Sequence, residues 1–170
     1  ARVLCRRGPG TSPPGALVLR GRVNLNVPAR GDLAGSIFVP AKTGPATWHF
    51  ESRQTSYVSP TGNVVATTAM PIVSSPPAWF WLAGVEVAAS GQTGAIVAFG
   101  DSITDGSQST VDANKRWPDE LARRLMAEPG NHAIGVLNEG IAGNRMLYDS
   151  LGPNGLARFD RDVLSQTGVT

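Results

Sequence analysis

The sequence predicts an α/β protein in two parts, a small β-sandwich-like module followed by a parallel α/β unit. Residues 17–90 hold short β-type runs separated by turn residues, which is typical of an antiparallel sheet. Residues 95–170 follow the order strand, loop, helix, strand, loop, helix, which is typical of a parallel sheet. Twenty glycines and 13 prolines, with only 16% charged residues, favour short strands and loops over a helical bundle.

The amino-terminal part is expected to be rich in β-structure. Residues 1–16 show no periodicity and many Gly and Pro, so we expect a flexible arm there. No helix of useful length can be drawn before residue 115, and Ser90–Gly94 (SGQTG) has the composition of a linker. The candidate strands, several of them bounded by Pro or Gly, are 17–19, 23–27, 36–39, 55–58, 64–67 and 80–87.

The second part opens with a strand and a helix. Ala95–Phe99 (AIVAF) is a continuous apolar run that fits a strand buried on both faces. Trp117–Glu128 has apolar residues at helical spacing, and Pro118 lies in the first turn, where proline is tolerated. Pro129 and Gly130 then end this helix.

A second strand and a second helix complete the pattern. Ile134–Leu137 is another short apolar run, and Gly155–Leu164 is a plausible helix. Residues 168–170 look like the opening of a third strand. The alternation of strands and helices is the reason for predicting a parallel sheet.

Composition excludes several classes of protein. Cys5 is the only cysteine, so there is no disulfide framework, and two histidines far apart in the sequence make structural zinc improbable. The net charge of +2, with no aromatic residues interleaved among the amino-terminal arginines, gives no argument for nucleic-acid binding. No apolar run approaches the ~20 residues of a membrane helix.

Two Gly-bearing loops, 100–106 (GDSITDG) and 138–145 (NEGIAGNR), follow the two predicted parallel strands. The carboxyl ends of such strands are where α/β sheets form their sites. Ser102 follows the first strand, and Asp101 or Asp105 could cap or brace its loop. A serine so placed could attack a carbonyl carbon if a base took its proton and N–H donors met the oxyanion. An ordinary strand-to-helix turn is the alternative.

These loops carry a family resemblance. Residues 96–106 (IVAFGDSITDG) closely resemble the first sequence block of the SGNH, or GDSL-type, hydrolases, and residues 136–147 (VLNEGIAGNRML) resemble the second. Thr104 stands where the Gly-x-Ser-x-Gly elbow of the α/β-hydrolases has its last glycine, so that family fits less well. Residues 44–81 resemble, more weakly, the β-rich module that some bacterial members carry. The match further takes in Asn114, 116–119 (RWPD) and 156–162 (LARFDRD).

The resemblance implies hydrolysis of carboxylic esters through an acyl-enzyme, on a flavodoxin-like three-layer α/β/α domain. Ser102 would be the nucleophile, and its own N–H would be one oxyanion donor. The backbone N–H of Gly143 would be a second donor, with a plain tight turn as the alternative for this glycine. The substrate would be a small ester, with carbohydrate-linked esters among the candidates. No cofactor is implied, because the serine route needs none.

Two later blocks of the family do not occur before Thr170. One is Gly-x-Asn-Asp, which supplies an oxyanion-hole asparagine, and the other is Asp-x-x-His, which supplies the base and its orienting acid. We therefore interpret residues 95–170 as the amino-terminal part of a hydrolase domain. Such a part would expose a sheet edge and apolar surface, so we expect a homo-oligomer or a complementing chain.

Other residues with reactive side chains have simpler interpretations. His132 lies in the turn before the second strand, at the opposite edge from the nucleophile, and is a loop residue rather than the base. His49 (in ATWHF) belongs to an aromatic cluster rather than to a ligand set. Asp160 and Asp162 are expected to be charges on an amphipathic helix, and Arg145 is expected to form a structural salt bridge rather than to contact substrate.

A serine esterase is thus the first functional hypothesis, and a catalytically silent binding or association module is the alternative. Binding that survives the loss of Ser102 would separate the two. The chain begins at Ala1 rather than Met and shows no signal peptide. A cleaved signal or an incomplete reading frame would look the same, so localisation stays open, although the resemblance suggests secretion.

Overall fold

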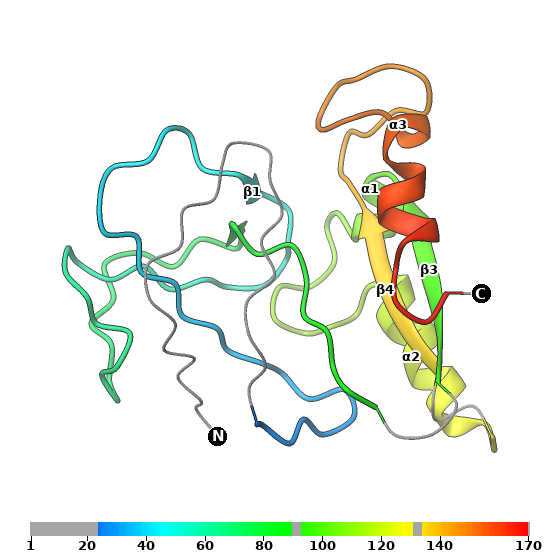
Figure 1. Cartoon of the computed structure of the whole chain (residues 1–170), viewed down its shortest axis with the longest axis horizontal. Coiled ribbons are helices and arrows are strands. Elements are labelled where there is room, and N and C mark those ends of the chain that lie inside the picture. Colours follow the sequence, from blue (N-terminus) through cyan, green and yellow to red (C-terminus); the bar gives the residue numbers. More distant parts are fainter. Residues whose placement is uncertain (1–23, 90–92, 131–133, 170) are drawn as a thin grey trace.

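The computed structural model of the chain describes residues 24–89, 93–130 and 134–169 (Figure 1). Its α/β unit is built on two parallel strands, β3 (Gly94–Gly100) and β4 (Ile134–Gly140). They pair over their whole length, from Gly94 opposite Ile134 to Gly100 opposite Gly140. Both strand predictions are confirmed, with the strands longer by a few residues. Ala98 is buried, but most side chains of the two strands are only half-buried, so the expectation of burial on both faces is wrong for the described chain.

The predicted helices are also present. Helix α2 (Trp117–Ala127) has its proline in the first turn, and the Asp119 carboxylate accepts the Arg116 N–H at 2.9 Å, which caps its start. Helix α3 (Gly155–Phe159) continues into the π-helical turn η1 (Asp160–Leu164), so the predicted second helix is confirmed with a change of winding. Helix α2 packs on β4, and η1 contacts β3.

The described part of the predicted third strand, 168–169, is not a strand. Gly168 (φ 88°) lies in a turn, and the Val169 N–H donates to Gln166 O at 3.3 Å. Gly168 nevertheless lies alongside β3, because its carbonyl accepts the Ala95 N–H at 2.8 Å. Gly168 therefore makes one backbone hydrogen bond to β3, but the segment does not form a β-ladder with it.

The predicted sandwich is not formed by residues 24–89. Strands β1 (Trp48–His49) and β2 (Trp79–Phe80) make a two-residue antiparallel pair, and Val58 and Ser74 form one further bridge. Each predicted run is only a few residues long and interrupted by Pro or Gly, so few ladder bonds are available to offset the cost of ordering it. The predicted strands at 36–39 and 64–67 are consequently irregular.

Some predictions lie outside the described residues, namely the arm at 1–16, the strand at 17–19 and most of the linker at 90–94. In the parts of the chain that the structure describes, no helix has both the length and the apolar character needed to cross a membrane.

Candidate active site

Ser102 begins α1 (Ser102–Asp105), a one-turn helix that directly follows β3. Asp101 has extended backbone, and its Oδ1 accepts the Ile103 N–H at 3.0 Å. Gly106 ends the turn in the left-handed region (φ 98°), and its N–H donates to Ser102 O at 3.0 Å. Of the two candidates, Asp101 and Asp105, it is Asp101 that caps this loop, and the cap fixes Ser102 as the first helical residue.

The register of the sheet brings the second predicted loop beside the first. Gly100 and Gly140 are paired at the ends of the two strands, and the Ile141 N–H donates to Gly100 O at 3.1 Å. Ser102 therefore lies two residues beyond this pair and Gly143 three residues beyond it. Gly143 has φ 75°, a backbone conformation that favours glycine. The two predicted site residues thus lie on adjacent loops at one end of the sheet.

Strand β4 approaches α1 very closely at Gly140. A Cβ added to Gly140 would lie 2.2 Å from the backbone nitrogen of Asp105, which is too close for any side chain. The Asn138 side chain reinforces this contact, because its Nδ2 donates to Thr104 O at 2.9 Å. The absence of a side chain at Gly140 is therefore what lets the two loops meet.

Asp105 braces the second loop from inside, whereas the sequence suggested that Asp101 or Asp105 would cap or brace the first loop. It is 1% exposed, and its Oδ2 accepts the Ala142 N–H at 2.9 Å. Its Oδ1 lies 2.7 Å from His49 Nε2. The His49 ring also packs edge-on against Trp79, which confirms the aromatic-cluster prediction. The bond to Asp105 was not predicted, because no local pattern links residues so far apart in the sequence.

Arg158 is a second buried polar group at this end of the sheet, and the sequence analysis did not single it out. It is 1% exposed, and its guanidinium lies 3.9 Å from the centroid of the Phe99 ring. The side chain joins both strand ends to the second loop and to η1. Its hydrogen-bond acceptors, at 2.8–3.1 Å, are Gly100 O, Glu139 O, Asn144 Oδ1 and Asp162 Oδ2.

The prediction of a surface charge is wrong for Asp162, which is only 7% exposed. Burial acts to raise the pKa of Asp162, but hydrogen bonds from Arg161 and Arg158 keep it below its ordinary value. The residue lies four positions after the buried Arg158, on the same face of the helix, and this explains its burial. Asp160 is exposed, as predicted.

Among the described residues at the strand ends, Glu139 has a strongly displaced pKa. Its burial, followed by the negative charge of Asp162, raises the pKa of Glu139 to about 7, against the opposing charges of Arg158 and Arg161. Glu139 therefore keeps its proton to a higher pH than an exposed glutamate would, on the strand that leads into the second loop. This carboxyl is consequently a weak counter-ion for Arg158.

The predicted salt bridge of Arg145 is not formed within the described residues. Arg145 is exposed, its Nη1 donates to the Tyr148 hydroxyl at 3.0 Å, and its guanidinium lies 5.2 Å from the Tyr148 ring centroid. The nearby acid Asp149 is engaged instead by the Asn154 backbone N–H and side-chain amide, both at 2.8 Å. Competition from these local donors explains why Arg145 pairs with an aromatic ring.

No base for Ser102 is present in the described chain. Ser102 Oγ has no hydrogen-bond partner among the described residues. His49, the one histidine in that part, directs its Nε2 to Asp105, and His132 lies outside the described residues. Nor do the described residues group three or more of the usual ligand side chains into a metal site.

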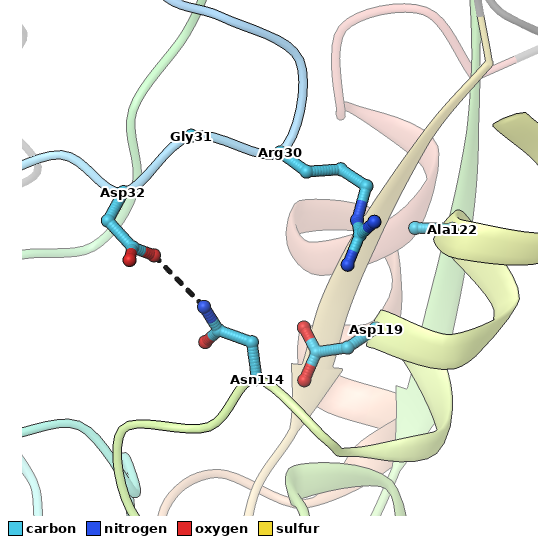
Figure 2. A pocket seen from close by; sticks show the side chains of 6 residues that line it. All are labelled: Arg30, Gly31, Asp32, Asn114, Asp119 and Ala122. Atoms are coloured by element: carbon cyan, nitrogen blue, oxygen red, sulfur yellow. Dashed lines mark hydrogen bonds between the residues drawn. The ribbon is translucent and has the colours of Figure 1, made fainter.

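A polar hollow of about 190 Å³ lies elsewhere, between residues 30–32 and the start of α2 (Figure 2). Among the residues that line it, Asn114 donates from Nδ2 to Asp32 Oδ1 at 2.9 Å (Figure 2). Neither Ser102 nor Gly143 lines this hollow, so it is separate from the predicted chemistry. Its lining residues are Arg30, Gly31, Asp32, Asn114, Asp119 and Ala122.

Parallel strands that end in two adjacent glycine-bearing loops define an α/β unit, and the carboxyl edge of its sheet is where such units form their sites. The family model described as GDSL-like lipase/acylhydrolase matches residues 96–169. These residues therefore belong to the GDSL-like, or SGNH, hydrolase family, which confirms the resemblance found in the sequence. No curated protein matches the chain.

Proposed function

We propose that this chain is a serine-dependent carboxylic ester hydrolase that works through an acyl-enzyme, with Ser102 as its nucleophile. The observation that carries the proposal is the pairing of Gly100 with Gly140, which sets the Ser102 loop beside the Gly143 loop. The family match over the same residues supports it.

The first chemical step is attack by Ser102 Oγ on the ester carbonyl carbon. The Oγ proton passes to a base and then to the departing alcohol, and water later hydrolyses the acyl-enzyme to release the acid and restore Ser102. The N–H groups of Ser102 and Gly143 are the proposed donors to the oxyanion. Within the described residues, neither N–H donates to another protein atom, so both remain available.

We infer that the base is a histidine outside the described residues. His49 is unsuitable, because Asp105 engages its Nε2 and its ring makes no hydrogen bond to Ser102. The candidates are a histidine of the family's Asp-x-x-His block and a histidine of a complementing chain, since His132 is expected at the opposite edge of the sheet from Ser102. The small ester substrate is taken to include carbohydrate-linked esters, as the resemblance suggests.

The finer fold proposed for residues 95–170 is the flavodoxin-like three-layer arrangement. The strand order in such folds places the first strand between the second and the third. Here β3 pairs with β4, and its Ala95 N–H also meets Gly168, at the place where a third strand would begin. The contacts of α2 with β4 and of η1 with β3 agree with helical layers on the sheet.

Ser102→Ala is expected to reduce hydrolysis of p-nitrophenyl acetate by roughly 10³-fold or more, because the nucleophile is lost. The purified 170-residue chain and its variant are compared at equal concentration. Ser107→Ala is the matched control, since Ser107 directly follows the same loop and has no role in the proposed chemistry. Equal rates for the native chain and Ser102→Ala would contradict the function for the 170-residue chain by itself.

We also propose that the chain associates with a second copy or with a complementing chain. Several large apolar side chains around the site end and on α3–η1 are strongly exposed. Static light scattering is expected to show a mass above that of the monomer, and a monomer at all concentrations would contradict this. The same exposure favours the second candidate function, a silent association module, which would associate equally after Ser102→Ala and show no turnover. The residues concerned are Ile103, Leu147, Leu156 and Leu164.

A further inference from the structure

We propose that His49 and Asp105 form a link that holds the Gly143 loop in place. The segment 48–55 is then a working part of the hydrolase site rather than a separable accessory module. Asp105 and His49 are positioning residues in this scheme, since neither touches the reacting atoms. The consequence for catalysis rests on the proposed function, in which Gly143 donates to the oxyanion, but the link itself does not.

The first part of the link is the buried carboxylate of Asp105. Its side chain is 2% exposed, so it depends on protein donors for the hydrogen bonds that water would otherwise make. One oxygen takes the Ala142 N–H at 2.9 Å, and the other lies 2.7 Å from His49 Nε2. Ala142 directly precedes Gly143, so the position of this carboxylate sets the position of the proposed oxyanion donor.

The second part of the link is the way in which His49 is held. The residue lies on β1, opposite Trp79 of β2, and the two rings meet edge-on with centroids 6.0 Å apart. The His49 side chain is 34% exposed, so the link lies at the boundary between the amino-terminal segment and the α/β unit. The Asp105 carboxylate is thus held by His49 on one side and by the Ala142 N–H on the other, which leaves it little freedom to move.

The segment after His49 docks on the loop that follows Asp105. Arg53 and Asp112 both adopt left-handed backbone (φ 54° and 58°), and the Asp112 N–H donates to Arg53 O at 2.9 Å. Such conformations persist only where surrounding contacts enforce them. The remaining polar contacts of this interface are Arg53 with Ser109 O, Gln54 with Asn114, Thr55 with Asp112, and Arg116 with Ser52 O.

The test measures hydrogen exchange of the Ala142 amide by NMR in the full 170-residue chain. His49→Phe keeps a ring of similar size but removes the donor to Asp105, and it is expected to speed Ala142 exchange about tenfold. His49→Gln keeps an N–H donor at nearly the same place and is expected to restore slow exchange. If His49→Phe does not fold, His49→Ala takes its place, since it needs no space.

Thr55→Val is the matched control, because it removes a hydrogen bond of the same interface without touching Asp105. It is expected to leave Ala142 exchange at the native rate, and the Leu137 amide of β4 reports that each variant is folded. Native exchange after His49→Phe, or an equal increase after Thr55→Val, would overturn the link. Failure of His49→Gln to restore slow exchange would also overturn it.

The exchange measurement separates this inference from the proposed function. It needs no turnover, and repeating it in the Ser102→Ala background is expected to give the same rates. If Ser102→Ala leaves turnover unchanged while His49→Phe still speeds exchange of the Ala142 amide, the proposed esterase function is contradicted and the link is retained. If the chain hydrolyses esters, His49→Phe is expected to lower kcat while leaving KM unchanged, because the oxyanion donor acts in the transition state.

Discussion

Arg158→Met is expected to lower the free energy of unfolding by about 3–5 kcal/mol, because it breaks a buried ion pair from one side. Methionine fills much of the same volume but donates no hydrogen bond. The buried Asp162 carboxylate would lose one of its two cationic partners, and the carbonyls of Gly100 and Glu139 would lose a donor. Urea denaturation followed by tryptophan fluorescence measures the loss.

Arg161→Met is the matched control for this experiment. Arg161 also bonds to Asp162, but its side chain is 62% exposed, so water replaces it at little cost. We expect a loss below about 1 kcal/mol for this variant. Losses of equal size for the two variants would mean that the burial of Arg158 contributes nothing to stability.

The elements predicted well from sequence are those whose signal is local. The apolar run at Ala95–Phe99 and the helical spacing over Trp117–Glu128 each specify an element without reference to the rest of the chain. The two loops were placed together because parallel strands carry their carboxyl ends to one edge, and the register of Gly100 with Gly140 bears this out.

The predictions that failed depend on partners far away in the sequence. The sandwich required several short runs to find matching strands, and among residues 24–89 only Trp48–His49 with Trp79–Phe80 and the Val58 bridge did so. Asp162 looks like a surface charge in the run RFDRD, because nothing local shows that Arg158 turns inward toward two strand ends. His49 and Asp105 are separated by 56 positions, and no periodicity connects them.

The largest fully buried side chains among the described residues are polar rather than apolar. Among the described residues, the fully buried hydrophobic side chains are alanines, whereas an aspartate and an arginine are buried beside the strand ends. Asp105 holds the Gly143 loop from one side, and Arg158 holds Asn144 of the same loop from the other. Both side chains are buried and hydrogen-bonded, and such satisfied buried polar groups hold the geometry of the loop rigidly.

Gly140→Ala is expected to destabilise the chain by about 3 kcal/mol and to disturb both loops at once. The new Cβ would meet the backbone of Asp105 at 2.2 Å from its nitrogen and 2.7 Å from its Cα, and backbone cannot rotate away as a side chain can. Strand β4 would have to move off α1, which would lengthen the Asn138–Thr104 and Ala142–Asp105 hydrogen bonds.

Gly135→Ala on the same strand isolates this steric cause. An added Cβ there would have Gly94 O as its nearest neighbour at 3.8 Å, an ordinary contact, so a change within about 0.5 kcal/mol is expected. Urea denaturation and Ala142 amide exchange are measured for both variants, and only Gly140→Ala should show lower stability and faster exchange. If both variants behave alike, the penalty comes from alanine in the strand, and the close approach of β4 to α1 does not hold the two loops together.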